Sequence, residues 1–256
     1  WITIQMLYLM GKYADESCIF LPIGVSPITE EDYKKQTEMS MLATLTWYCG
    51  DKCQIQAPLI MKTQDFFNYL KECVDGSTRL SVIPLKLLSK TGLSHANMLI
   101  YDKINNTLER FEPHGHESPD EFHPYLLDIT LPKMFAKFVT GKEVIYIPPQ
   151  AFCPVKGHQV IEQIERETLG ITLAEGKGLC SVWSFIYANL RLQYPDKTNI
   201  EIMDFISSQV TSDKKLYQYA ENIIIAMWSL SEKIRVAKTE EDIQTAVLES
   251  VKILKI

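Results

Sequence analysis

The most informative pattern along the chain is a change from helical spacing of apolar residues to strand-like alternation near residue 79, and back again after residue 178. In the first part of the chain, two segments carry apolar side chains at helical spacing, residues 28–48 and residues 63–74. Thr29 and Thr63 can cap the starts of these two predicted helices. Helical spacing returns in 180–194, 199–210, 213–236 and 239–254. Both ends of the chain are therefore predicted to contribute helices.

The middle of the chain predicts strands at 79–89, 95–102, 107–112 and 143–147. The Lys-Ile-Asn-Asn sequence at 103–106 favours a tight turn between the second and third of these strands. We therefore expect an α+β fold in which a small mixed β-sheet packs against the helix that starts at Cys180, with additional helices at both ends.

The length of 256 residues suits one domain, and we expect three parts within it. These parts are an N-terminal helical part at 1–78, a core at 79–195 and a C-terminal helical part at 196–256.

Composition and net charge limit the kinds of partner that the protein is expected to bind. Hydrophobic residues make up 46% of the chain, charged residues 23%, and the formal net charge is −6, so no basic surface for nucleic acid is expected. No apolar run approaches the roughly 20 residues of a membrane helix, and 1–10 lacks the features of a secretory signal. The six cysteines show no repeated spacing, which favours reduced thiols. We expect a monomer in the cytoplasm.

One cysteine stands where a reactive thiol is expected. Cys180 follows the glycines Gly176 and Gly178 and opens a long apolar helix. Free N–H groups and the positive helix dipole at a helix start stabilise a thiolate and can face a developing oxyanion. A structural cysteine at a helix start remains the alternative.

Two further residues supply the remaining roles of a nucleophilic triad. His95 opens an apolar strand, and Glu112 closes the next one. A turn at 103–106 places His95 near the level of His114 and within reach of Glu112. A carboxylate at that position orients the imidazole and stabilises its protonated form.

The order His95, Glu112, Cys180 resembles the clan of adenovirus-type proteases and SUMO- and ubiquitin-like-protein proteases. The separation of 17 residues between His95 and Glu112 matches that clan, and the sequence around Cys180 also looks like proteins of large DNA viruses. The resemblance covers about 79–195. Ala96 stands where many members have Trp, and Ser181 where many have Gly.

The resemblance implies a cysteine peptidase or isopeptidase that cleaves ubiquitin or a ubiquitin-like modifier by thiol acyl transfer, without metal or cofactor. If the protein is viral, as the likeness to proteins of large DNA viruses implies, we expect it in the host-cell cytoplasm or in the virion. The resemblance also implies a glutamine that donates to the oxyanion. Gln159 is our candidate, with an insertion before Cys180, and Gln150 and Gln163 are its rivals. We further expect substrate contacts at three residues, Gly178, Trp183 and Asn97.

Other interpretations stay open at this point. The same residues suit a protease that processes a viral polyprotein, or an acetyltransferase that uses coenzyme A. A non-enzymatic interaction module is a third possibility. Metal sites are conceivable at Cys49 and Cys53, or in a second segment that offers His114, His116, Glu117, Asp120 and His123. For that second segment a solvated loop is the competing interpretation.

Overall fold

The structure, a computed structural model, describes residues 2–13, 15–20, 44–56, 63–116, 119–171, 179–210 and 216–253. Its centre is a mixed sheet with the order β3-β2-β4-β5-β6-β7, and β1 pairs with β4 on the edge that β2 also uses. The strands are β1 (Ser17–Ile19), β2 (Leu45–Cys49), β3 (Cys53–Gln56), β4 (Leu80–Ser89), β5 (Ser94–Asp102), β6 (Thr107–Phe111) and β7 (Ile145–Ile147). The predicted α+β class is confirmed.

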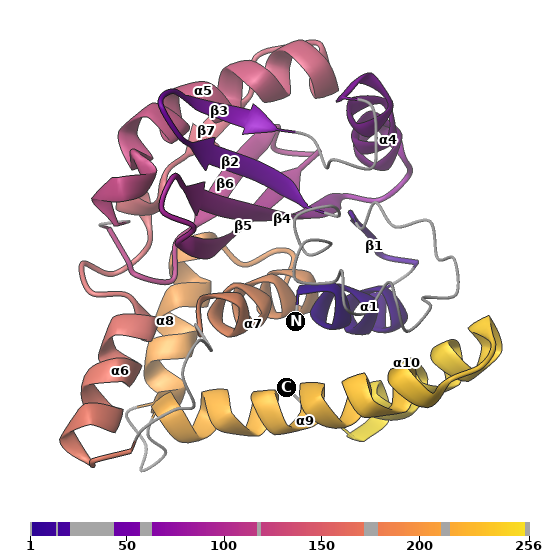
Figure 1. Cartoon of the computed structure of the whole chain (residues 1–256). Helices are drawn as coiled ribbons and strands as arrows, with labels where there is room; N and C mark the ends of the chain where they lie inside the picture. The colour runs from indigo at the N-terminus through magenta and orange to yellow at the C-terminus, as the bar shows by residue number, and fades with distance from the viewer. Residues whose placement is uncertain are drawn as a thin grey trace.

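Helices cover both faces of this sheet (Figure 1). They are α1 (Ile2–Tyr13), α4 (Thr63–Asp75), α5 (Pro124–Phe135), α6 (His158–Thr168), α7 (Cys180–Gln193), α8 (Asn199–Val210), α9 (Leu216–Val236) and α10 (Glu240–Ile253). Short helical turns lie at Asp120–Phe122, Ala136–Thr140 and Pro149–Ala151. Among the described helices, none is both long and apolar enough to span a membrane.

Alternation along the strands divides the apolar side chains between two cores. On β5, Met98 and Ile100 join the core formed with α1, α7 and the C-terminal helices. Leu99 and Tyr101 point the other way and join the core formed with α4 and α5. The two cores account for the near-continuous burial of β5, a strand enclosed on both faces.

Helix α7 is buried along most of its length and is fixed to the sheet by polar contacts. Arg191 donates to Glu109 at 2.7 Å, and the hydroxyl of Tyr187 donates to the same carboxylate oxygen at 2.8 Å. At the other end, Ser184 donates to the carbonyl of Ala96 at 3.3 Å. Breaking a buried ion pair of this kind costs about 3–5 kcal/mol, so the Glu109 contacts hold the later part of α7 on β6. The Ser184 contact lies near the start of α7, which carries Cys180.

The β5–β6 hairpin has the register that a turn at 103–106 predicts. Asp102 pairs with Thr107 and Met98 pairs with Phe111. Asp102 accepts the backbone N–H groups of Ile104 and Asn105, which holds the turn closed. This register brings the start of β5 beside the residues that follow β6.

The helix predicted at 28–48 is wrong at its C-terminal end, and 28–43 lies outside the described residues. Leu45–Cys49 is strand β2, which pairs in parallel with β4. Leu45 continued the helical spacing, but Thr46 and Trp47 favour a strand once β4 offers a partner. The N-terminal part, 1–78, is therefore not only helical, because β1, β2 and β3 belong to it.

The expectation of reduced thiols is also corrected. Cys18 and Cys73 form a disulfide that joins β1 to α4, and Cys49 and Cys53 form one across the β2–β3 hairpin. Sequence spacing did not reveal the first pair, because its members are separated by 55 residues and meet only when α4 packs beside β1. The second pair replaces the possible half zinc site at the same residues.

Candidate active site

Cys180 is the first residue of α7, and its sulfur lies between that helix and the start of β5. The backbone N–H groups of Ala96 and Ser181 donate to the sulfur, and His95 forms a side-chain hydrogen bond with it. The residue is 9% exposed, so it is enclosed yet still reaches the surface. A Gly-rich approach to the helix start was the signal for this site, although Gly176 and Gly178 lie outside the described residues.

His95 lies between Cys180 and Glu112. Its Nε2 is 2.5 Å from Oε1 of Glu112, and both side chains are buried. Because Nε2 faces the carboxylate, Nδ1 is left for the thiol. The structure thus brings together the three residues that the sequence singled out as nucleophile, base and orienting acid.

The charges of this group favour an imidazolium–thiolate pair. Burial lowers the pKa of His95, but the Glu112 carboxylate and the bond to Cys180 outweigh burial, so the net pKa is raised. Burial raises the pKa of the Cys180 thiol, but His95 and the two backbone N–H groups outweigh it, so the net pKa is lowered. Both shifts favour the charged forms near neutral pH.

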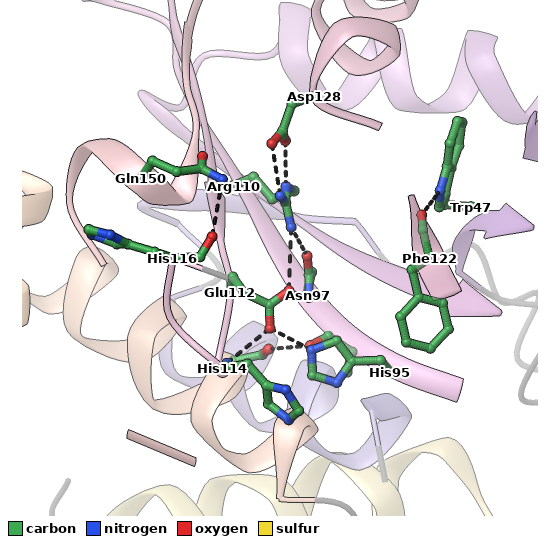
Figure 2. A network of polar contacts seen from close by, with 12 residues as sticks. Trp47, His95, Asn97, Arg110, Glu112, His114, His116, Phe122, Asp128 and Gln150 are labelled. Carbon is green, nitrogen blue, oxygen red and sulfur yellow. Dashed lines mark hydrogen bonds and ion pairs between the residues drawn. The ribbon is translucent and has the colours of Figure 1, made fainter. Parts of the chain in front are cut away.

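A buried network holds Glu112 from behind (Figure 2). Asn97 Nδ2 donates to Glu112 Oε2 at 3.1 Å, and Arg110 donates to the same oxygen at 3.4 Å. Arg110 also donates to Asn97 Oδ1 at 2.6 Å and makes two bonds to Asp128, at 2.8 and 3.0 Å. Tyr146 donates to Asp128 at 2.5 Å. The network fixes Oε2 and leaves Oε1 for His95.

Two side chains flank the imidazole of His95. The ring of His114 lies 4.6 Å from it between centroids, and the backbone N–H of His114 donates to Glu112 Oε1 at 2.9 Å. The ring of Phe122 stacks at 6.0 Å, and its carbonyl accepts the indole N–H of Trp47 at 2.7 Å. Figure 2 shows His114 and Phe122 on different sides of His95.

The loop after β6 crosses the segment before α6 at two glycines. A Cβ on Gly115, whose φ is +101°, would meet the Pro154 carbonyl at 2.4 Å, and one on Gly157 would meet the Pro113 carbonyl at 2.1 Å. The Gly157 N–H donates to the His114 carbonyl at 2.8 Å. Only glycines allow this approach, which brings the start of α6 against the loop that follows Glu112.

Gln159 lies at this crossing. Its backbone N–H donates to the Pro113 carbonyl at 3.2 Å, and its side-chain Oε1 is buried without a hydrogen-bond partner. Its rivals are engaged elsewhere, since Gln150 donates to the His116 carbonyl and Gln163 donates to Glu167 on an exposed face of α6. Gln159 as the oxyanion donor stays a prediction.

The predicted substrate contacts need correction. Trp183 is 0% exposed in the α7 core, where it stacks on His158, and Asn97 is 1% exposed and bonded to Glu112 and Arg110. Neither side chain is available to a substrate. The sequence did not distinguish a polar residue that supports the site from one that touches substrate. Gly178 lies outside the described residues.

The suggested histidine-rich metal site does not form as expected. Among the described residues, the group of potential ligands close enough for one metal ion is His95, Glu112 and His114. His116 and His123 are not part of it, and Glu117 lies outside the described residues.

The Arg110–Asp128 pair behind the site was not predicted from the sequence. Asp128 interrupts the apolar sequence of α5, and that interruption was the available signal, whereas Arg110 directly follows Glu109 in β6 and gave no such signal. A buried charge in an apolar element needs a partner, which predicts a pair but does not say with whom.

Comparison with known proteins gives one relative by sequence and several weak structural likenesses. No family model matches the chain. A protein of Acanthamoeba polyphaga mimivirus described as an ankyrin repeat protein, L371, is 29% identical over 140 residues, which are 52% of this chain and 18% of that protein. The chain therefore spans less than a fifth of the length of that relative.

Among solved structures, ChlaDub1 from Chlamydia trachomatis has a TM-score of 0.45 at 12% identity, with 93% of this chain and 92% of that chain covered. The C. trachomatis effector Cdu1, solved bound to ubiquitin, has a TM-score of 0.44 at 14% identity, with 93% of each chain covered. The Legionella pneumophila effector RavZ has 0.36 at 14%, covering 98% of this chain and 78% of that chain.

Proposed function

We propose that the protein is a cysteine peptidase or isopeptidase that cleaves ubiquitin or a ubiquitin-like modifier by thiol acyl transfer. The observation that carries the proposal is the hydrogen-bonded series from Cys180 to His95 to Glu112. Each member has the environment that its role requires, with the thiol at a helix start and the carboxylate buried and fixed.

The first step is attack of the Cys180 thiolate on the carbonyl carbon of a peptide or isopeptide bond. A C–S bond forms, the carbonyl oxygen becomes an oxyanion, and the His95 imidazolium gives its proton to the leaving amine as the C–N bond breaks. Water gives a proton to His95 as it attacks the thioester. The C–S bond then breaks, the acid product leaves as a carboxylate after losing its proton to solvent, and the Cys180 thiolate is restored beside the His95 imidazolium. Glu112 stays ionised and stabilises the imidazolium.

The oxyanion in both steps requires hydrogen-bond donors. The backbone N–H of Cys180, at the start of α7, is the first proposed donor, and the side-chain amide of Gln159 is the second. Its buried, unpartnered Oε1 supports this role, because an amide held with its oxygen inward presents its NH₂ group outward. One such donor is worth about 3–4 kcal/mol of transition-state stabilisation.

Ubiquitin and its relatives are proposed as substrates because of the sequence resemblance carried by the segments around His95, Glu112 and Cys180. The experiment is to incubate the chain with C-terminal electrophile probes of ubiquitin and of ubiquitin-like modifiers, and to map any adduct by mass spectrometry. We expect a covalent adduct at Cys180 with at least one probe, and none with Cys180→Ala.

An adduct at Cys153 in place of Cys180 would overturn the site. Hydrolysis of an unrelated peptide without any probe adduct would point to a polyprotein protease, and acetyl transfer from labelled coenzyme A would point to an acetyltransferase. Either result would contradict the proposed substrate class.

A further inference from the structure

His114 lies against the proposed catalytic group but has no part in its chemistry. It is half-buried, its ring is tilted by 55° to that of His95, and neither imidazole nitrogen makes a hydrogen bond within the described part of the chain. Its backbone is held firmly, because its N–H donates to Glu112 and its carbonyl accepts the N–H of Gly157. An imidazole held beside a second imidazole and a carboxylate is a set of metal-binding groups.

The three side chains are already close enough to share one ion. One nitrogen of His95, one of His114 and one oxygen of Glu112 lie within 4.8 Å of one another. In tetrahedral zinc sites the bond lengths of about 2.0–2.2 Å place ligand atoms roughly 3.4 Å apart. Small side-chain rotations therefore convert the group into three zinc ligands.

We infer that His95, Glu112 and His114 form a zinc-binding site that competes with the proposed peptidase chemistry. Two imidazoles and one carboxylate suit zinc better than magnesium or calcium, which prefer oxygen ligands. The metal takes Nε2 of His95 and the carboxylate of Glu112. The neutral imidazole then carries its proton on Nδ1, so this nitrogen cannot accept a proton from the thiol or from water. The inhibitory consequence rests on the proposed function, whereas the binding does not.

The surroundings of Glu112 both organise and limit this site. Asn97 and Arg110 hold Oε2, which leaves Oε1 facing the two imidazoles, and such outer contacts orient metal ligands. The Arg110 guanidinium also places a positive charge behind the carboxylate, which opposes a second cation. The site therefore suits a reversible regulatory ion rather than a permanent structural one.

The residues that would bind zinc here differ from those of a zinc ion that binds the reactive thiol. Cys180 is not a member of the close group. Zinc that simply captures the reactive thiol would depend on Cys180 and ignore His114. Zinc at the inferred site depends on His114 and tolerates the loss of the thiol.

The experiment measures zinc binding by isothermal titration calorimetry, and cobalt binding by its visible absorption, in the Cys180→Ala chain. We expect one zinc ion per chain. Adding His114→Ala to this variant should weaken zinc binding at least about tenfold, because one of three ligands is lost. Adding His116→Ala, a matched change two residues away in the same loop, should alter the affinity less than twofold.

Loss of the site in Cys180→Ala itself, or unchanged affinity after His114→Ala, would overturn the inference. Circular dichroism checks that the variants fold, and His114→Gln replaces His114→Ala if the latter does not. In the wild-type chain, zinc should suppress any adduct with the ubiquitin probes, and a chelator should restore it. If no probe reacts, the proposed function fails while the calorimetry still tests the site.

Discussion

Two regions of the molecule hold a free cysteine, and the sulfurs meet opposite surroundings. Cys153 follows the short turn Pro149–Ala151 and joins the apolar core, where burial raises the pKa of its thiol to about 12. Cys180 opens α7 beside the His95 imidazole, and the net pKa of its thiol is lowered. Exposure differs little, at 3% and 9%.

The comparison teaches that enclosure alone does not make a thiol reactive. Burial opposes the thiolate at both positions, and Cys153 even accepts the backbone N–H of Glu112 without overcoming it. What differs is a cation that forms a hydrogen bond with the sulfur. The His95 imidazolium, held by Glu112, reverses the sign of the pKa shift at Cys180. At Cys153 the charge of Arg110 also lowers the pKa, but burial and the carboxylates of Glu112 and Glu109 outweigh it.

The largest expected effect is on alkylation rates. At pH 7, a thiol with a pKa of about 12 is ionised to roughly one part in 10⁵, so we expect iodoacetamide to modify Cys180 at least about 10³-fold faster than Cys153. The rate at Cys153 should rise tenfold for each pH unit from 7 to 9, while the rate at Cys180, whose thiol has a lowered pKa, should rise less steeply.

Mass spectrometry of timed labelling measures both rates in one sample, and Cys153→Ser and Cys180→Ala verify the assignments. Serine keeps a hydrogen-bond acceptor for the Glu112 N–H. A rate at Cys180 that also climbs tenfold per pH unit would show that His95 does not stabilise its thiolate.

The next largest effect is expected when the carboxylate of Glu112, which stabilises the His95 imidazolium, is removed. Glu112→Gln should lower kcat/KM on a reactive ubiquitin substrate by about 10²–10⁴-fold, because an amide neither stabilises the imidazolium nor selects the tautomer of His95. Glu109→Gln is the matched control, a buried carboxylate of β6 that pairs with Arg191. It should lower the melting temperature but leave the activity per folded molecule within about threefold. Equal losses of activity in both variants would assign Glu112 a structural role only.

A smaller effect tests the oxyanion donor. Gln159→Ala should lower kcat by about 10²-fold with little change in KM, because the amide acts in the transition state. Gln163→Ala, four residues along α6 on its exposed face, should change neither parameter more than twofold. A change in KM alone would instead place Gln159 in substrate binding.

Much of the site could be predicted because two local patterns fix it. The turn at 103–106 sets the register of β5 and β6, and that register places Glu112 within reach of His95. The helix start at Cys180 is equally local. Neither feature depends on knowing how distant elements pack.

The remaining features depend on such packing. The strand Leu45–Cys49 needs β4 as its partner, and Cys18 meets Cys73 only when α4 lies beside β1. Likewise, Asp128 reaches Arg110 only because α5 covers that face of the sheet. A sequence pattern shows the periodicity of one helix or strand. These contacts depend in addition on where a second helix or strand packs, which the pattern does not show.

The smallest expected effect tests whether the Arg110–Asp128 pair positions Glu112. Asp128→Asn weakens the hold on Arg110 and hence on Glu112, so we expect about a tenfold loss of kcat/KM. With Glu112 less fixed, the pKa of Cys180 should rise, and the acid limb of its alkylation profile should move to higher pH.

Asp102→Asn is the matched control, because it removes a similar carboxylate, paired with Arg79 at the far end of β5. It should cost stability without moving that profile. If Asp128→Asn does not fold, Tyr146→Phe removes one contact of Asp128 and should shift the profile in the same direction by a smaller amount. A profile that moves equally in the Asp102 variant would mean that general loosening, and not the hold on Glu112, sets the reactivity of Cys180.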